Sequence, residues 1–309
     1  MRAEPRSRVL VTGGAGFIGR RLVRSLAAAG HEVTVVDLRP FPGAGIGTVT
    51  GDIRDDSVLA RAVRPGTDTI FHLAAATSVV ESIGDPAGTY QTNVAATASL
   101  LELARATGVR AFLLASTNAV VGNVGAATIT ERSPLRPLSP YGATKAAAEM
   151  LLSCYAGVYG MTTCSLRFSN VYGPGMQEKD SFIPRLMRAA RDGKVVQVRG
   201  DGSMIRDVVH VDDVVAGILG AWRAGHTGPV ILGSGQSVTV MDMVEAARIV
   251  TGAPLPCELV PAGPGEMPAV LLDISVARGL GYAPAYDLKS GLATVWPEFA
   301  GAEEATSER

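Results

Sequence analysis

The chain has 309 residues, of which 47% are hydrophobic and 18% are charged, a composition typical of an α/β protein with one large or two modest cores. A net charge of −1 argues against nucleic acid or an anionic membrane as the main partner, and no apolar run approaches the ~20 residues of a membrane-spanning helix. The start of the sequence shows no signal-peptide pattern. Because Cys154, Cys164 and Cys257 cannot all pair and the four histidines form no ligand cluster, we expect a reduced, cytoplasmic protein without a metal site.

Up to Asn170, short runs of β-branched residues alternate with helical patterns. Strands are expected at residues 8–12, 31–37, 69–75, 111–116 and 162–168. Helices are expected at residues 16–30, 57–63, 85–108 and 142–158. Apolar strands separated by helices indicate a parallel sheet that is covered on both faces. The sequence therefore predicts the α/β class, with a doubly wound parallel sheet of the Rossmann type.

Beyond Asn170 the alternation becomes less regular. We expect helices at 181–193, 211–225 and 238–252, a strand and turn at 195–203, a strand at 229–235, and loops at 171–180 and 254–268. The predicted domains are a Rossmann domain at 1–170 with returning segments at about 204–250, a smaller C-terminal substrate-binding lobe at 171–203 and 251–300, and a disordered tail at 301–309.

A glycine-rich turn follows the first predicted strand at once, in "VLVTGGAGFIG". Its glycines show G-x-G-x-x-G spacing in one register and G-x-x-G-x-x-G spacing in another, through Gly13, Gly14, Gly16 and Gly19. Glycines let the backbone approach a pyrophosphate at the N-terminus of a helix. Asp37 ends the second strand, where a carboxylate would bind both ribose hydroxyls and repel a 2′-phosphate. NAD is therefore the predicted cofactor, although the positive charge of Arg39 opposes the preference over NADP.

Tyr141 and Lys145 are spaced i, i+4 at the start of a predicted helix, so they share one helix face. A tyrosine with a pKa of ~10 is a poor base at neutral pH. A nearby ammonium and the positive nicotinamide ring would both favour the phenolate. Such a phenolate takes a proton from a sugar or alcohol hydroxyl while hydride passes to NAD. The alternative is a surface pair that contributes a few tenths of a kcal/mol.

Seven segments in this order, TGGAGFIG, GDIRD, HLAA, STNAVVG, YGATK, RFSNVYGPG and RDVVHVDD, resemble the extended short-chain dehydrogenase/reductase family. Within it, the chain is similar to the NAD-dependent nucleotide-sugar epimerases and dehydratases, from about Val9 to Tyr286. The segments "SVVESIGDP" and "PGEMPAVLLD" resemble those of UDP-glucose 4-epimerases. The resemblance implies a 4-epimerase of a UDP- or dTDP-hexose. It also implies a homodimer that pairs the helices near 90–107 and 142–158 in a four-helix bundle.

The resemblance also implies roles for individual residues. Thr117 would hydrogen-bond the reacting hydroxyl, completing a catalytic triad with Tyr141 and Lys145. The cofactor-binding residues would be Gly13, Gly16, Phe17, Ile18, Gly19, Asp37, Asp52, Ile53, Leu73, Ala74, Ala75, Asn93, Tyr141 and Lys145. The substrate-binding residues would be Thr117, Asn170, Arg199, Arg206 and Val270. Among these, Asn170 and Arg206 would hold the diphosphate and Arg199 would stack on the base. Val270 would be a small gate beside the sugar 2-position, unless Leu271 or Met267 fills the space.

Several positions depart from the pattern of the family. Asn118 and Ala119 stand where the dehydratases and the decarboxylases carry an acid, and neither side chain ionises. Loss of water needs a base and an acid there, so a dehydratase is disfavoured; a decarboxylase is disfavoured less. Val121 replaces a tyrosine, and Gly263 replaces an arginine near the diphosphate. A 4-ketoreductase and a catalytically silent NAD-binding regulator also stay open as functions, although a regulator has no need of the catalytic triad.

Other polar residues are predicted to be structural. Asp207, His210 and Asp213 surround a helix start, and Asp212 is expected to cap that helix. His31 and His72 are expected to be packing residues.

Overall fold

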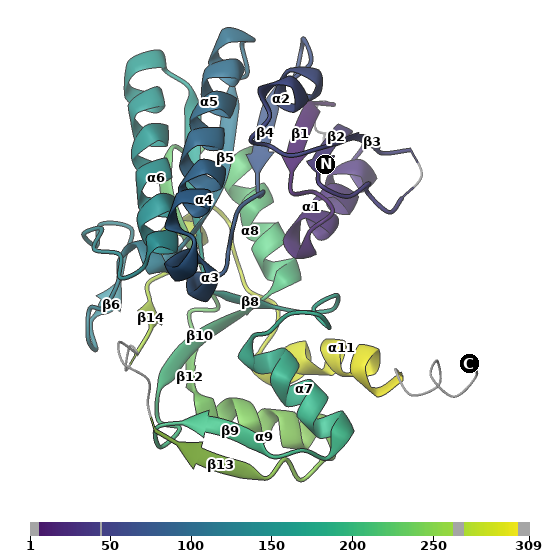
Figure 1. Cartoon of the computed structure of the whole chain (residues 1–309), viewed down its shortest axis with the longest axis vertical. Coiled ribbons are helices and arrows are strands. Elements are labelled where there is room, and N and C mark those ends of the chain that lie inside the picture. The colour runs from purple at the N-terminus through teal and green to yellow at the C-terminus, as the bar shows by residue number, and fades with distance from the viewer. Residues whose placement is uncertain (1–5, 44, 262–268, 302–309) are drawn as a thin grey trace.

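The computed structural model describes residues 6–43, 45–261 and 269–301. Its larger body is a seven-stranded sheet in which every pairing is parallel (Figure 1). The strand order is β11-β7-β5-β4-β1-β2-β3, so the winding direction changes between β1 and β4. The strands are β1 (Arg8–Thr12), β2 (Glu32–Asp37), β3 (Gly47–Thr50), β4 (Thr69–His72), β5 (Ala111–Thr117), β7 (Thr162–Phe168) and β11 (Gly228–Leu232). The predicted α/β, doubly wound fold is confirmed, and such a sheet binds ligands where the winding reverses.

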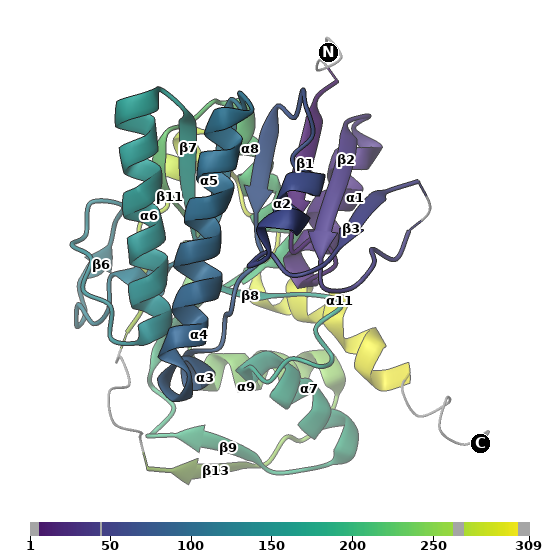
Figure 2. The ribbon, with the colours of Figure 1, turned by 45° about the horizontal axis from the view of Figure 1, so that its top comes forward.

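Helices cover both faces of the sheet, because alternate residues of each strand point to opposite faces. From β1, Val9 and Val11 pack in one core with residues of α1 (Phe17–Ala28) and α8 (Val211–Arg223). Leu10 packs in a second core with residues of the helices on the other face. Those helices are α2 (Asp56–Ala62), α5 (Ala96–Ala106) and α6 (Pro140–Tyr159), which Figure 2 shows beside the strands.

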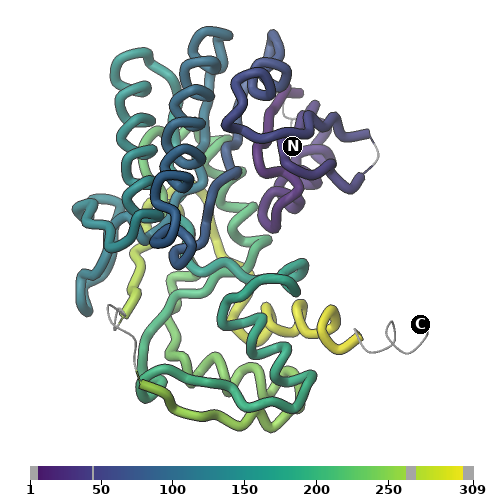
Figure 3. Tube along the Cα trace, viewed as in Figure 1, coloured from purple at the N-terminus to yellow at the C-terminus, as the bar shows by residue number. Residues whose placement is uncertain are grey.

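A smaller lobe lies at one end of the sheet (Figures 1 and 3). It holds a three-stranded sheet, β12-β10-β8, and a two-stranded sheet, β13-β9, packed with three helices. The strands are β8 (Asn170–Tyr172), β9 (Val196–Arg199), β10 (Ile205–His210), β12 (Ser237–Thr239) and β13 (Cys257–Val260), and the helices are α7 (Phe182–Asp192), α9 (Val240–Thr251) and α11 (Leu288–Ala300). β14 (Leu271–Leu272) pairs with β6 (Thr128–Ile129), and α10 (Ser275–Gly279) packs against β11 and α8 of the larger body.

The lobe differs from the sequence-based prediction in several elements. β10 and β12 belong to the lobe, although the sequence predicts that residues at about 204–250 return to the large sheet, and β13 forms within the predicted loop at 254–268. Residues 170–172 form β8 rather than the start of a loop, because they pair with β10. α9 packs against α7 and α11, so it lies in the lobe and not with the segments that return to the large sheet. Helix α11 was not predicted. The domain boundaries beyond these elements stay a prediction, and residues 262–268, including Gly263 and Met267, and the tail beyond 301 lie outside the described residues.

The long helix expected at 85–108 contains a change of helix type. It starts as α4 (Pro86–Tyr90), where the Asp85 carboxylate accepts a hydrogen bond from the Gly88 N–H. A π-helical turn over Gln91–Ala95 follows, and α5 then continues the helix. A π turn adds one residue to a helical turn and re-aims the side chains within it, frequently at functional sites.

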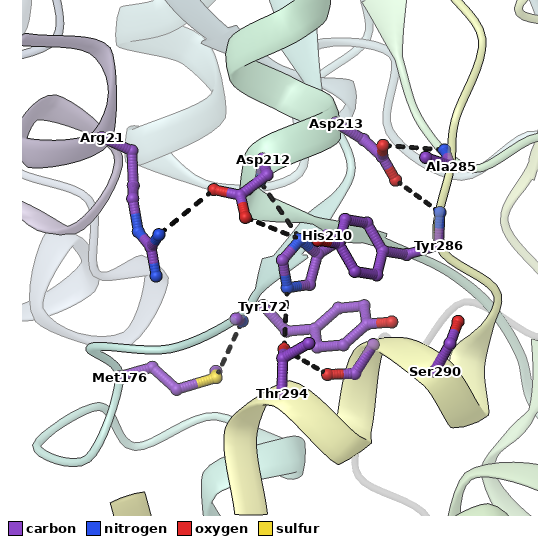
Figure 4. A network of polar contacts seen from close by, with 12 residues as sticks. Arg21, Tyr172, Met176, His210, Asp212, Asp213, Ala285, Tyr286, Ser290 and Thr294 are labelled. Atoms are coloured by element: carbon purple, nitrogen blue, oxygen red, sulfur yellow. Dashed lines mark hydrogen bonds and ion pairs between the residues drawn. The ribbon is translucent and has the colours of Figure 1, made fainter. Parts of the chain in front are cut away.

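A network around His210 joins α8 to the lobe (Figure 4). The His210 Nδ1 accepts a hydrogen bond from the Asp212 N–H, so His210 and not Asp212 is the N-cap of α8, and the predicted capping role of Asp212 is wrong. The His210 ring stacks on Tyr286 at 3.9 Å, and its Nε2 lies 3.0 Å from the Thr294 hydroxyl in α11. The Asp213 carboxylate accepts hydrogen bonds from the backbone N–H groups of residues 285 and 286. These contacts agree with the predicted structural roles of His210 and Asp213.

The remaining residues predicted to be structural are also buried and hydrogen-bonded. Asp207 accepts bonds from the Ser234 N–H and hydroxyl and from the Gly235 N–H, which fixes the turn after β11. His31 packs edge-on against Trp222. His72 lies between two threonine hydroxyls, 2.6 Å from that of Thr12 and 3.0 Å from that of Thr97.

Candidate active site

The glycine-rich turn packs the backbone between β1 and α1 too closely for side chains. A Cβ atom at Gly19 would lie 2.1 Å from the Gly13 carbonyl oxygen, and one at Gly13 would lie 2.7 Å from the Ala74 nitrogen. Gly13 also has a φ of 69°, which glycine adopts without strain. Gly16 is the N-cap of α1 and offers no side chain to the first-turn N–H groups. These N–H groups, together with the helix dipole, fit an anion such as a pyrophosphate.

Asp37 ends β2 beside this turn. Its carboxylate accepts hydrogen bonds from the Ala15 N–H at 2.9 Å and from the Arg39 N–H at 3.1 Å, which ties the glycine-rich turn to β2. Asp52, two residues after β3, forms a 2.6 Å ion pair with Arg54. The hydrogen bond from Arg54 lowers the pKa of Asp52. Ile53 between them is buried. The arrangement presents a carboxylate for ribose hydroxyls and an apolar wall for an adenine.

A cavity of about 630 Å³ runs along the carboxyl ends of the strands, at the point where the winding reverses. Most of the predicted cofactor-binding residues line it, namely Gly13, Gly16, Phe17, Ile18, Gly19, Asp37, Asp52, Ile53, Leu73, Ala74, Ala75, Tyr141 and Lys145. Asn93 does not line the cavity but lies buried next to the segment that does. Its side chain bonds to the Ala76 N–H and carbonyl at 2.9 Å each, and to the Thr144 hydroxyl at 3.0 Å. The π turn thus aims Asn93 at both the cavity wall and α6.

Tyr141 stands at the start of α6, where Ser139 is the N-cap and Pro140 follows it. Its backbone N–H donates to the Ser82 hydroxyl. Burial raises the pKa of the Tyr141 phenol, and a hydrogen bond with Thr117 partly offsets that rise. The sequence predicts that Lys145 favours the phenolate, but its ammonium donates to the Ala115 carbonyl at 2.9 Å, and Lys145 is not among the groups that shift the pKa of Tyr141. The protein's own groups therefore favour the neutral phenol.

Lys145 and Thr117 both sit where β5 meets α6. Lys145 is buried, which lowers the pKa of its ammonium to about 8. Thr117 ends β5 and also accepts a hydrogen bond from the Ala119 N–H at 3.2 Å, so the strand-end capping role and a role beside Tyr141 occur together. Tyr141 and Lys145 line the cavity, and Thr117 hydrogen-bonds Tyr141 without lining the cavity itself.

The predicted substrate-binding residues of the lobe do not line this cavity. β8 places Asn170 next to Val208 of β10, two residues from Arg206, and the Asn170 amide donates to the Asp207 carbonyl. The Arg206 guanidinium donates to the Ile205 carbonyl at 2.8 Å. Arg199 is exposed on β9, and Val270 is buried beside β10, with its N–H bonded to the Ile205 carbonyl. Their roles toward a substrate stay predictions.

Several residues that line the cavity were not identified from the sequence. They include Ser78, Glu81, Asp85, Thr92, Ser116, Phe168 and Lys179. The ammonium of Lys179 lies 4.4 Å from the centroid of the Phe17 ring, at the first residue of α1. The only sequence signal for Lys179 is that lysine is rare, with four in the chain. Its position depends on the folding of a loop from the lobe onto the glycine-rich turn.

The described residues contain neither a metal centre nor a membrane span. Within 6–43, 45–261 and 269–301, no group of three or more His, Cys, Asp or Glu side chains is placed to hold a metal ion. In the same part of the chain, no helix combines the length and the apolar character needed to cross a membrane.

Comparison with known proteins decides the family. The model of the NAD-dependent epimerase/dehydratase family matches residues 9–233. The chain belongs to this family. Similar members include a dTDP-glucose 4,6-dehydratase of Streptomyces griseus, 36% identical, and a UDP-glucose 4-epimerase of Corynebacterium glutamicum, 31% identical; the alignments cover 92% and 94% of both chains. The crystal structure of a UDP-glucose 4-epimerase of Thermus thermophilus with NAD is 32% identical, with a TM-score of 0.88 over 96% of this chain and 99% of the other.

The family is NAD-dependent, and the cavity of this member fits that cofactor. The close-packed glycines and the uncapped start of α1 suit a pyrophosphate, while the Asp37 carboxylate suits an unphosphorylated ribose. When bound, NAD would supply a hydride acceptor with a positively charged ring. The residues that would hold NAD are those of the glycine-rich turn, Asp37, and residues 73–76, which line the cavity.

Proposed function

We propose that this family member is an NAD-dependent nucleotide-sugar 4-epimerase that acts on a UDP- or dTDP-hexose. The observation that carries the proposal is that Tyr141 and Lys145 line a cavity that fits NAD, with Thr117 hydrogen-bonded to Tyr141. Tyr141 takes the proton of the sugar 4-hydroxyl and later returns it, and Thr117 hydrogen-bonds the same oxygen. The positive nicotinamide ring would favour the phenolate, and Lys145, which lines the same cavity, would help to bind the cofactor. Lys179 adds a positive charge at the phosphate end.

The residues next to Thr117 favour epimerisation over dehydration. Asn118 is buried and its amide donates to the Phe168 carbonyl at 3.3 Å, and Ala119 carries no functional group. Neither residue can protonate a leaving hydroxyl or remove a carbon-bound proton. Besides Asp37 and Asp52, two acidic residues line the cavity: Asp85 caps α4, and Glu81 is exposed on α3 (Val79–Gly84). The dehydratase relatives nevertheless make dehydration the second candidate.

Product analysis separates these functions. The purified protein should be incubated with UDP- and dTDP-hexoses, with and without added NAD, and the products identified by NMR. An epimerase yields the 4-epimer alone and reaches the same equilibrium from either side. A 4-keto-6-deoxy product would identify a dehydratase, release of carbon dioxide from a hexuronate would identify a decarboxylase, and a requirement for stoichiometric reduced cofactor would identify a ketoreductase.

We propose that the protein is a homodimer formed by α5 and α6, which contact each other side by side (Figure 2). Met150 and Val158 on α6 are 61% and 66% exposed, and the neighbouring positions that face outward carry small or apolar side chains. An apolar helix face of this kind is typical of a subunit interface.

Light scattering at micromolar concentration is expected to give about twice the chain mass of 31.9 kDa. The double substitution Met150→Glu/Val158→Glu should shift the protein to the monomer, because the carboxylates that it introduces would be buried and unpaired in the interface. Ile249→Glu, at a similarly exposed position of α9, is the control and should remain dimeric. A wild-type mass near 31.9 kDa would refute the dimer.

The compartment that we propose is the reducing cytoplasm. Its support is that Cys154, Cys164 and Cys257 are all free, and that Cys164 is buried in the core.

Val270 gives a prediction about the sugar 2-position. If Val270 is the gate, the wild type accepts UDP-N-acetylhexosamines as well as hexoses, and Val270→Tyr lowers the kcat/KM ratio of UDP-GlcNAc to UDP-glucose by more than about 100-fold, because a ring-sized clash exceeds the effect of a methylene misfit. Val270→Leu should change the ratio by less than about 10-fold. The position is only 6% exposed, so packing by Leu271 is the competing arrangement. A wild type that rejects UDP-GlcNAc, or an unchanged ratio in Val270→Tyr, would show that Val270 is not the gate.

A further inference from the structure

The first turn of α6 carries Tyr141, and the backbone N–H groups of this turn need partners from outside the helical ladder. Pro140 has no N–H group. The Gly142 N–H donates to the Ser139 hydroxyl at 3.2 Å, and the Ala143 N–H donates to the Ser139 carbonyl at 2.9 Å. The N-cap therefore satisfies the residues that follow Tyr141, but not the Tyr141 N–H itself.

The partner of the Tyr141 N–H comes from a different helix. The Ser82 hydroxyl of α3 accepts this hydrogen bond at 3.2 Å and donates its own proton to the Val79 carbonyl at 2.7 Å. Because that proton is used within α3, the lone pairs of the Ser82 oxygen are left to accept from Tyr141. Ser82 is 1% exposed, so its hydroxyl is shielded from water. One buried hydroxyl thus joins α3 to the backbone of the residue that carries the phenol.

α3 packs against α6 and also forms part of the cavity wall, through Ser78 and Glu81. A second side chain holds the carbonyl of the same residue. The Thr144 hydroxyl donates to the Tyr141 carbonyl at 2.8 Å and accepts a hydrogen bond from the Asn93 amide at 3.0 Å. The backbone of Tyr141 is therefore held at its N–H from α3 and at its carbonyl from the π turn.

We propose that Ser82 is a positioning residue for Tyr141, which fixes through the Tyr141 backbone where the phenol stands in the cavity. A tyrosine side chain is long, so a small rotation of the first turn of α6 moves the phenol oxygen further than it moves the backbone. An acid–base group must lie within hydrogen-bond reach of the proton that it transfers, and a displacement therefore lowers the rate. The proposal rests on the acid–base role of Tyr141 in the proposed function.

The test compares Ser82→Ala, which removes the hydroxyl, with Ser82→Thr, which keeps it. Ser82→Ala is expected to lower kcat by about 10-fold or more, while KM and the Kd for NAD change less than about 3-fold. Ser82→Thr should retain kcat within about 3-fold of the wild type. If the added methyl group prevents folding, Ser82→Cys takes its place, because a thiol is a weaker acceptor of similar shape. Its kcat should fall between those of the wild type and Ser82→Ala.

Thr163→Val is the matched control. The Thr163 hydroxyl of β7 is also buried and donates to the Leu152 carbonyl at 2.9 Å, about three turns further along α6 than Tyr141. This substitution likewise removes a buried hydrogen bond between a hydroxyl and the backbone of α6. It should leave kcat within about 3-fold of the wild type, because the bond lies far from the phenol.

The Tyr141→Phe background separates positioning from a purely structural role. If Ser82 acts through the phenol, adding Ser82→Ala to Tyr141→Phe should lower the residual kcat by less than about 2-fold. A loss as large as that in the wild-type background would make Ser82 a purely structural residue and would overturn the proposal.

A second readout needs no substrate. The phenolate absorbance of Tyr141 is titrated as the difference between each NAD-bound protein and its Tyr141→Phe form. Its midpoint should lie at higher pH in Ser82→Ala, because the positive nicotinamide ring would stabilise a displaced phenolate less. A folded Ser82→Ala protein with the kcat and the midpoint of the wild type would overturn the proposal. A wild type without epimerase activity would remove the proposed function, while the titration would still decide whether Ser82 positions Tyr141.

Discussion

Tyr141→Phe is expected to lower kcat by at least ~10²-fold, the lower end for the loss of a positioned acid–base group. The substitution removes one hydroxyl and keeps the ring, so the packing at the start of α6 should be unchanged. KM should change little, because the hydroxyl acts on the proton that moves in the reaction rather than on substrate binding. Because burial raises the pKa of Tyr141 and the phenolate is the active form, kcat of the wild type should rise with pH on the acid limb.

Tyr282→Phe is the matched control for this substitution. The Tyr282 hydroxyl is buried and donates to the Gly233 carbonyl at 2.8 Å, away from the cavity. Its loss should cost about 1 kcal/mol of unfolding free energy and leave kcat within a few-fold of the wild type. If Tyr141→Phe also retains kcat within a few-fold, Tyr141 is not the acid–base residue.

Gly19→Ala is expected to abolish NAD binding at concentrations that saturate the wild type. A Cβ at this position would lie 2.1 Å from the Gly13 carbonyl oxygen and 2.7 Å from the Gly14 Cα, so backbone and not a flexible side chain must move. The movement separates α1 from the glycine-rich turn and misplaces the N–H groups that the pyrophosphate requires. We expect the Kd for NAD to rise by more than about 100-fold and the unfolding free energy to fall by about 1–3 kcal/mol.

Calorimetric titration of NAD measures the first effect and thermal unfolding the second. Gly279→Ala is the control, because Gly279 is the exposed last residue of α10 and nothing lies within 4 Å of a Cβ there. Its Kd for NAD should equal that of the wild type. Normal NAD affinity in a folded Gly19→Ala protein would show that the cofactor does not lie on this turn.

The sheet could be predicted from the sequence because its strands are local apolar runs. β1 and β7 occur at the predicted residues, since buried parallel strands need continuous β-branched or aliphatic residues. The pairing of β8 with β10 could not be predicted, because β8 has only three residues and its partner lies far away in the chain. The π turn at Gln91–Ala95 leaves the helical pattern of the sequence intact, so only coordinates show it.

Some residues of the candidate active site could be predicted and others could not. Most of the predicted cofactor-binding residues belong to short contiguous motifs, and the structure brings these motifs together along one cavity. The contact of Lys179 with Phe17 and the buried ion pair of Glu149 and Arg167 were missed, since both depend on the fold. His210 takes the capping position that the sequence predicts for Asp212, because a histidine ring nitrogen accepts the helix N–H. The substrate-binding roles of Asn170, Arg199, Arg206 and Val270 stay predictions.

Transient oxidation at carbon 4 is the central claim, and isotope tracing tests it most directly. UDP-glucose carrying deuterium at carbon 4 should be incubated with the purified protein in ordinary water, and the product examined by mass spectrometry and NMR. We predict UDP-galactose that retains the deuterium at carbon 4, because the hydrogen removed from that carbon returns to it from the other face. Loss of the deuterium to solvent, or its appearance at carbon 6 of a 4-keto-6-deoxy sugar, would contradict the epimerase.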